Sequence, residues 1–124
     1  MKSIAFVIPW GGNLPVYFQL WLESCRRNPS VDFLVFTDDC TEYNYPDNVK
    51  VHYMSFEQMK ELFQKHYDFP LSIRAPYKFC DFRPAFGEIF SDYLVGYDYW
   101  GHCDVDLIWG DIRKFVTDLS LIHI

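Results

Sequence analysis

The sequence is short of positive charge. Its 124 residues contain 11 lysines and arginines against 17 aspartates and glutamates, which gives a formal net charge of −6 at pH 7. A protein that binds nucleic acid must neutralise a phosphate backbone with basic side chains, so an acidic protein has the wrong sign for that partner. We therefore expect no nucleic acid among the partners of this protein.

The sequence also lacks closely spaced cysteines: its four cysteines lie far apart, and there is no CxxC pair. This pattern is typical neither of a structural zinc site nor of a secreted domain held together by disulfides. The apolar runs are also too short to cross a membrane. We expect free thiols in a reducing compartment, no transmembrane segment in these residues, and a location in the cytoplasm or at the inner face of the membrane. The thiols belong to Cys25, Cys40, Cys80 and Cys103.

Hydrophobic residues, in contrast, make up 50% of the chain and aromatic residues 20%, enough for the packed core of one domain. Apolar runs of strand length alternate with apolar residues at helical spacing. The predicted strands are 4–9, 31–37, 49–54 and 97–103, and the predicted helices are 14–25, 56–66 and 77–94, the last kinked or restarted at Pro84. This alternation predicts an α/β, Rossmann-like fold whose mostly parallel sheet carries helices on both faces.

The last residues of the sequence indicate a domain boundary. Residues 119–124, Leu-Ser-Leu-Ile-His-Ile, resemble the translation of a transposase adapter used in sequencing libraries. A genuine short apolar terminus is the alternative. We expect one domain at 1–118, a non-native tail at 119–124, and a natural protein that continues past residue 118.

Ligands of parallel α/β sheets bind at the carboxyl ends of the strands, so the residues that follow each strand are candidates. Pro9, Trp10 and Gly11 lead from the first strand into a helix start, which suits a phosphate or a nucleotide base. The sequence has neither GxGxxG nor GxxxxGK[ST], and a plain tight turn is the alternative. Asp38 and Asp39 follow the second strand, where a carboxylate can bind ribose hydroxyls or lie in a solvated turn.

Two further carboxylates, Asp104 and Asp106, follow the last strand. In an extended backbone residues i and i+2 point to the same face, so both could address one divalent ion. Carboxylate oxygens favour Mg²⁺ or Mn²⁺ completed by phosphate oxygens and water. A chain this rich in Asp contains about one DxD by chance, so the position at a strand end carries the prediction.

Lys78, Asp81 and Arg83 lie near the start of the third predicted helix. The two basic groups could meet a diphosphate, and Asp81 could orient them or bind sugar hydroxyls. An exposed helical ion pair between Lys78 and Asp81 is the alternative.

These segments, taken in order, resemble those of GT-A-type glycosyltransferases. They are the first strand ending in Ile8-Pro9, Asp38-Asp39 after the second strand, residues 78–84 (Lys-Phe-Cys-Asp-Phe-Arg-Pro), and residues 101–111 (Gly-His-Cys-Asp-Val-Asp-Leu-Ile-Trp-Gly-Asp). The likeness is greatest to an uncharacterised family found with bacterial polysaccharide genes. It covers residues 1–118, the nucleotide-binding half of such an enzyme. The glycine-rich run that usually precedes the acidic pair in DXD enzymes is replaced here by residues 99–103, Tyr-Trp-Gly-His-Cys.

The resemblance implies a metal-dependent transfer of sugar from a nucleotide-diphosphate donor, commonly a UDP-sugar, to a polysaccharide or glycolipid acceptor. It implies Asp38 or Asp39 near the uridine and Lys78 and Asp81 near the donor. It also implies Mn²⁺ or Mg²⁺ on Asp104 and Asp106. An inverting reaction would need a general base, for which Asp111 is a candidate by proximity alone.

Two other functions remain open from the residues. A metal-dependent phosphohydrolase or nucleotidyltransferase could use Asp104 and Asp106 equally well. A non-catalytic α/β binding module could use the tryptophans and tyrosines as a contact surface.

Overall fold

The apolar runs of the sequence form one parallel sheet. The computed structural model describes residues 2–115, and its strands are β1 (Ile4–Trp10), β2 (Val31–Thr37), β3 (Val49–Tyr53) and β4 (Tyr99–His102). The strand order is β3-β2-β1-β4, and each neighbouring pair is parallel. The predicted α/β fold with a parallel sheet is therefore confirmed. The predicted domain boundary at residue 118 and the tail at 119–124 lie outside the described residues.

Helical segments connect the strands. They are α1 (Phe18–Arg26), α2 (Phe56–Gln64), the 3₁₀ helix η1 (Pro76–Ala85), α3 (Phe86–Ile89), the 3₁₀ turn η2 (Ser91–Tyr93) and α4 (Ile112–Phe115). A capping box begins α2, since the Ser55 side chain accepts from the Gln58 backbone and the Gln58 side chain accepts from the Ser55 backbone. Within the described part of the chain, no helix is long and apolar enough to span a membrane.

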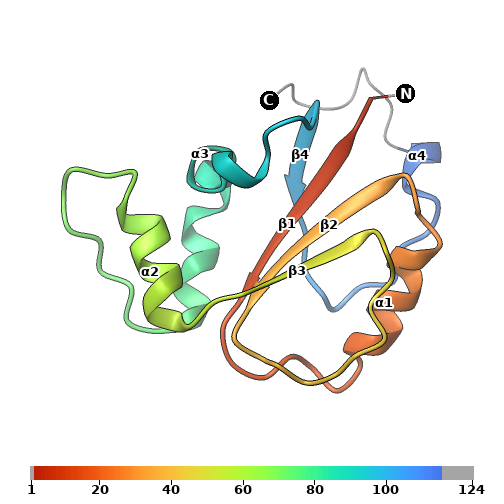
Figure 1. Ribbon diagram of the computed structural model, residues 1–124, viewed down its shortest axis with the longest axis horizontal. Helices are drawn as coiled ribbons and strands as arrows, with labels where there is room; N and C mark the ends of the chain where they lie inside the picture. Colours follow the sequence, from red (N-terminus) through yellow and green to blue (C-terminus); the bar gives the residue numbers. More distant parts are fainter. Residues whose placement is uncertain (1, 116–124) are drawn as a thin grey trace.

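The helices cover both faces of the sheet (Figure 1). Successive residues of a strand point to opposite faces. Ile4 and Ile8 of β1 accordingly pack in a core with α1 and α4, whereas Ala5 and Val7 pack in a second core with α2, η1 and α3. A strand that is buried on both faces has to be apolar at nearly every position, which is the pattern that the first predicted strand showed.

The first helix begins later than predicted. Apolar spacing predicted a helix from residue 14, but α1 starts at Phe18. Leu14 precedes Pro15, and the residue before a proline is disfavoured in a helical conformation. The backbone N–H of Leu14 donates to the side chain of Asp39 at 2.7 Å in the loop that follows β1.

The segment predicted as a helix over 77–94 winds mainly as a 3₁₀ helix. Pro84 has no N–H and its ring clashes with the carbonyl four residues earlier, so an α-helix cannot run through it. In a 3₁₀ helix side chains three residues apart lie above one another. Phe79 and Phe82 therefore share one stripe on the core, while Cys80 and Arg83 share another.

The strand order creates a switch point beside β1. The chain moves from β1 to β2 and then β3 on one side, and returns to place β4 on the other side of β1. Ile4 to Val7 of β1 pair with Tyr99 to His102 of β4. Helices that leave neighbouring strands on opposite sides open a crevice at the carboxyl ends of those strands, where α/β proteins bind ligands.

Asn48 ties the loop before β3 to the end of α1 and the start of β2. Its side chain is buried, and its amide nitrogen donates at 2.9 Å to the carbonyls of Cys25, Asn28 and Val31. The carbonyls of Cys25 and Asn28 also accept from the backbone N–H groups of Asn28 and Val31. A single buried amide thereby joins the loop, the end of α1 and the start of β2.

We expect Asn48→Ala to lower the free energy of unfolding by about 2 kcal/mol, because the buried hydrogen bonds of the Asn48 amide are lost. Equilibrium unfolding in urea measures the change. The control is Asn44→Ala, whose exposed side chain should change stability by less than about 0.5 kcal/mol. Equal stability of the two variants would contradict the structural role of Asn48.

Candidate functional site

A cavity opens at the switch point, between the end of β1, η1 and the segment after β4. Its volume is about 70 Å³. A second hollow of about 240 Å³ shares Pro9, Trp10 and Cys80 with it and extends over Tyr77. Because the two share these residues, we treat them as one site, the switch-point cavity. Its polar end is formed by Arg83 and Asp104, and its apolar end by Pro9, Trp10, Gly11, Pro76 and Tyr77.

Arg83 and Asp104 form an ion pair at the polar end. The Arg83 guanidinium donates to the Asp104 carboxylate, and this hydrogen bond raises the pKa of Arg83 above its ordinary value. A guanidinium carries five N–H donors, so it can bind a carboxylate and present further donors to an oxyanion. The Asp104 side chain is 56% exposed, which leaves it open to solvent and to a ligand.

The apolar end depends on close approach of η1 to the loop after β1. A Cβ atom on Gly11 would lie 2.5 Å from Cβ of Pro76, which is shorter than any ordinary contact. Gly12, the next residue, has φ +87°, a conformation that glycine adopts without strain. Gly11 is thus required for packing, and Gly12 for the turn.

Asp38 and Asp39 hold this loop in place. Asp38 accepts a hydrogen bond from the Gly12 backbone at 2.9 Å and is exposed. Asp39 is only 9% exposed, and its oxygens accept from the backbone of Leu14 and from the backbone and hydroxyl of Thr41. The Thr41 hydroxyl, followed by the two backbone donors, lowers the pKa of Asp39. Asp39 therefore organises the rim, while Asp38 remains accessible to a ligand.

The two carboxylates of the DxD motif lie in different places. Asp104 lines the switch-point cavity, whereas Asp106 lines a separate hollow against α1. The prediction that both address one ion assumed an extended backbone, but the chain bends at residues 105–107. Among residues 2–115, no group of three or more His, Cys, Asp or Glu side chains is placed to hold a metal ion.

Other predicted residues lie outside the cavity. Lys78 and Asp81 occupy a different stripe of η1 from Cys80 and Arg83, and the Lys78 ammonium lies 5.3 Å from the centre of the Tyr77 ring. Asp111 lies between Gly110 and Ile112, which both bond to Asn28 at the start of β2. Asp111 is therefore at the end of the sheet opposite the switch-point cavity.

Three residues of the site were not predicted from the sequence: Tyr77, Cys80 and Cys103. The signal for the first two was their spacing, because Tyr77, Cys80 and Arg83 are three residues apart and therefore share one stripe of a 3₁₀ helix. Cys103 lines the cavity beside Asp104, and burial raises the pKa of its thiol. Cys80, by contrast, is exposed.

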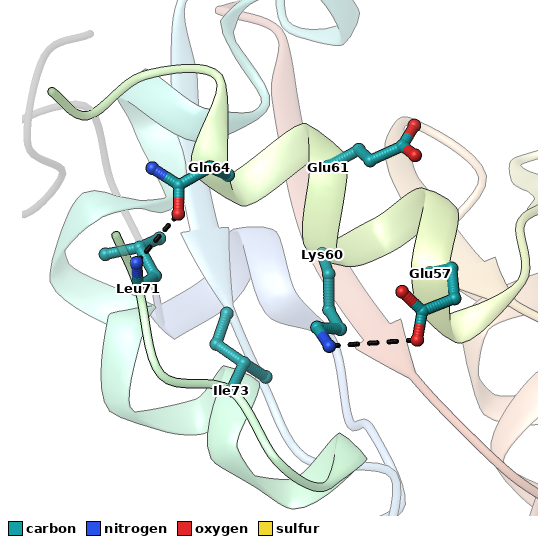
Figure 2. A pocket seen from close by; sticks show the side chains of 6 residues that line it. All are labelled: Glu57, Lys60, Glu61, Gln64, Leu71 and Ile73. Carbon is teal, nitrogen blue, oxygen red and sulfur yellow. Dashed lines mark hydrogen bonds and ion pairs between the residues drawn. The ribbon is translucent and has the colours of Figure 1, made fainter. Parts of the chain in front are cut away.

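A further cavity, of about 220 Å³, lies between α2 and the loop that follows it. Figure 2 shows Gln64 turned toward Leu71 and Lys60 toward Glu57, while Glu61 points away from them. The Gln64 carbonyl oxygen accepts from the Leu71 backbone at 2.7 Å, and Lys60 lies 3.7 Å from Glu57. These polar groups bind one another and hold the loop against α2, so the local structure accounts for the polar residues of this cavity.

Comparison with known proteins gives one family match. A sequence model described as "Family of unknown function (DUF6625)" matches residues 6–123, nearly the whole chain. No curated protein and no solved structure matches the chain.

We expect Asp39→Asn to lower the free energy of unfolding by about 2 kcal/mol at pH 7, because an amide cannot accept all the bonds of the carboxylate. The lowered pKa of Asp39 gives this difference a pH dependence. The stabilisation by the Asp39 carboxylate is complete above about pH 3.9, the pKa of an aspartate in the unfolded chain, and is lost as the pH falls through the lower pKa of the folded state. The difference in the free energy of unfolding between wild type and Asp39→Asn should therefore become smaller in acid.

Urea unfolding at pH 7 and at a series of acidic pH values measures this difference. Asp47→Asn, on an exposed position of the same loop, is the matched control and should follow the wild type throughout. A stability gap for Asp39→Asn that stays constant down to strong acid would contradict the assigned role.

Proposed function

We propose that this chain, which belongs to the DUF6625 family of unknown function, is a glycosyltransferase that uses a nucleotide-diphosphate sugar as its donor. One observation carries the proposal. At the switch point of a parallel sheet, a cavity combines an aromatic end at Trp10 and Tyr77 with a charged end at Arg83 and Asp104. A nucleoside diphosphate has the same two parts, an aromatic base and a doubly anionic group.

The aromatic end suits the nucleobase. Trp10 and Tyr77 line the larger hollow together with Pro9 and Pro76, and such apolar and aromatic surfaces bind flat rings by stacking and by burial of apolar area. Exposed Asp38, bonded to Gly12 at the same rim, is the group we assign to the ribose hydroxyls.

The charged end suits the diphosphate. Arg83 is the guanidinium that lines the cavity, and its planar fork matches phosphate oxygens in bidentate geometry. When the bond between sugar and phosphate breaks, negative charge grows on the departing diphosphate. Arg83, already oriented by Asp104, would stabilise that charge with little reorganisation.

The cation predicted from sequence is compatible with Asp104. Mg²⁺ is commonly held through one or two carboxylates together with phosphate oxygens of the substrate and water. The one carboxylate of Asp104 at the cavity is enough for this kind of coordination. Mg²⁺ or Mn²⁺ bound there would supply further positive charge to the leaving diphosphate. Asp106, which faces another hollow, is not assigned to this cation.

We expect the chain to bind UDP or GDP more tightly than AMP, and more tightly with Mn²⁺ than without it. Arg83→Met should weaken binding of the preferred diphosphate by at least about tenfold, because a charge-assisted bidentate contact is lost. Arg27→Met, which removes an exposed guanidinium at the end of α1, is the matched control and should bind like wild type. Isothermal titration calorimetry measures each affinity.

Two results would contradict the transferase. One is equal affinity of the Arg83 and Arg27 variants for the diphosphate. The other is hydrolysis of a simple phosphate ester such as p-nitrophenyl phosphate, which would favour the phosphohydrolase alternative.

We also expect nucleoside diphosphate to protect Cys80 from alkylation by iodoacetamide. Cys80 is exposed and lines both parts of the switch-point cavity, so a bound ligand covers it. Ser72→Cys, at an exposed position on the loop after α2, provides an internal control thiol. Burial raises the pKa of Cys25 and Cys103, so both should react slowly.

Mass spectrometry of tryptic peptides, with and without UDP, reports the rate of alkylation at each cysteine. Equal protection of the Ser72→Cys thiol and of Cys80 would place the ligand outside the assigned cavity or show a general change of the chain.

A further inference from the structure

Exposed apolar side chains gather beside the first turn of α1. Leu20 and Ile108 are 64% and 57% exposed, and Tyr17 is also exposed. With Leu107 and Asp106 they line a hollow of about 380 Å³, here called the α1 hollow. Single exposed apolar residues are ordinary, but several gathered around one hollow mark a site of interaction.

Both walls of the hollow are held by the core. Phe18 and Trp21 on α1 are fully buried, which turns Tyr17 and Leu20, three residues apart, outward together. The second wall is formed by the segment after β4. In this segment Val105, which precedes Asp106, is buried. Trp109, which follows Asp106 in the chain, packs against Phe6 with 5.1 Å between the ring centroids. The position of Asp106 is thus fixed by apolar packing around it.

The α1 hollow adjoins the switch-point cavity. Asp104 lines the cavity, Asp106 lines the hollow, and buried Val105 separates them. Two residues span at most about 7 Å of chain, so the backbones of Asp104 and Asp106 are close and the hollow lies beside the cavity. Transfer of a sugar requires the acceptor hydroxyl within about 3.5 Å of the reacting carbon, so an acceptor site must adjoin the donor site.

The lining of the hollow restricts what can occupy it. It combines one carboxylate with aromatic and aliphatic side chains, those of Tyr17, Leu20, Asp106, Leu107 and Ile108. An anionic lipid surface is disfavoured by Asp106 and by the net charge of −6. A glycoside fits better, because its hydroxyls can donate to a carboxylate while its C–H faces and an apolar aglycone contact aromatic and aliphatic side chains.

We propose that the α1 hollow is the acceptor subsite, and that it takes a glycoside with an apolar aglycone. Asp106 accepts a hydrogen bond from an acceptor hydroxyl, the Tyr17 ring packs against the sugar, and Leu20 and Ile108 contact the aglycone. This inference rests on the proposed transferase. It assigns the second carboxylate of the DxD motif to the acceptor, and the first to the donor.

Octyl β-D-glucoside, used below its micelle concentration, is the probe. Added to the ¹⁵N-labelled chain, it should shift the amide resonances of residues 17–20 and 106–108 and leave those of residues 80–83 unchanged. Asp106→Asn should weaken this binding by about tenfold, because a hydrogen bond to a charged acceptor is lost. Asp68→Asn, on an exposed position after α2, is the matched control and should bind like wild type.

Three outcomes would overturn the inference. They are the absence of shifts at these residues, shifts at the switch-point cavity instead, and equal shifts from an octyl sulfobetaine, which has the same tail and no sugar. A parallel titration with UDP keeps the two proposals apart. If UDP binds and the glucoside does not, only the acceptor subsite fails. If the glucoside binds and UDP does not, the transferase fails and the acceptor role with it.

Discussion

The pairing of β4 with β1 is the constraint on which the rest of the structure depends. β1 hydrogen-bonds to β2 on one edge and to β4 on the other, so a strand from near the end of the described chain lies against the first one. This brings residues 103–104 beside Trp10, with η1 packed across the gap. Long-range parallel pairing of this kind requires a crossover, and here the crossover itself carries Arg83 into the cavity.

Much of this architecture could be predicted from the sequence, because strands buried on both faces must be apolar at nearly every position. The run 31–37 coincides with β2, and the capping box at Ser55 marks the start of α2. The side of β1 on which β4 would lie could not be read from any local pattern, because it is decided by packing of the whole chain. The position of the switch point was therefore a result of the structure.

The site residues show where local rules reach their limit. An extended backbone would have put Asp104 and Asp106 on one face, but Val105 is buried at a bend and the two carboxylates diverge. Likewise, Lys78, Asp81 and Arg83 were predicted together near the start of one helix, whereas the 3₁₀ winding of η1 places Arg83 on a different stripe. Burial of Val105 decides the first geometry, and burial depends on the tertiary fold. Pro84 decides the second, because an α-helix cannot run through it.

The contact between Gly11 and Pro76 has a consequence for how such a pocket could diversify. The gap between the Gly11 backbone and the Pro76 ring is filled by a hydrogen atom, since even a methyl group would overlap Pro76. Any replacement of Gly11 would force the loop after β1 and η1 apart and change the room above Trp10. A single codon change could therefore alter the size of the aromatic end while the strands beneath it remain as they are.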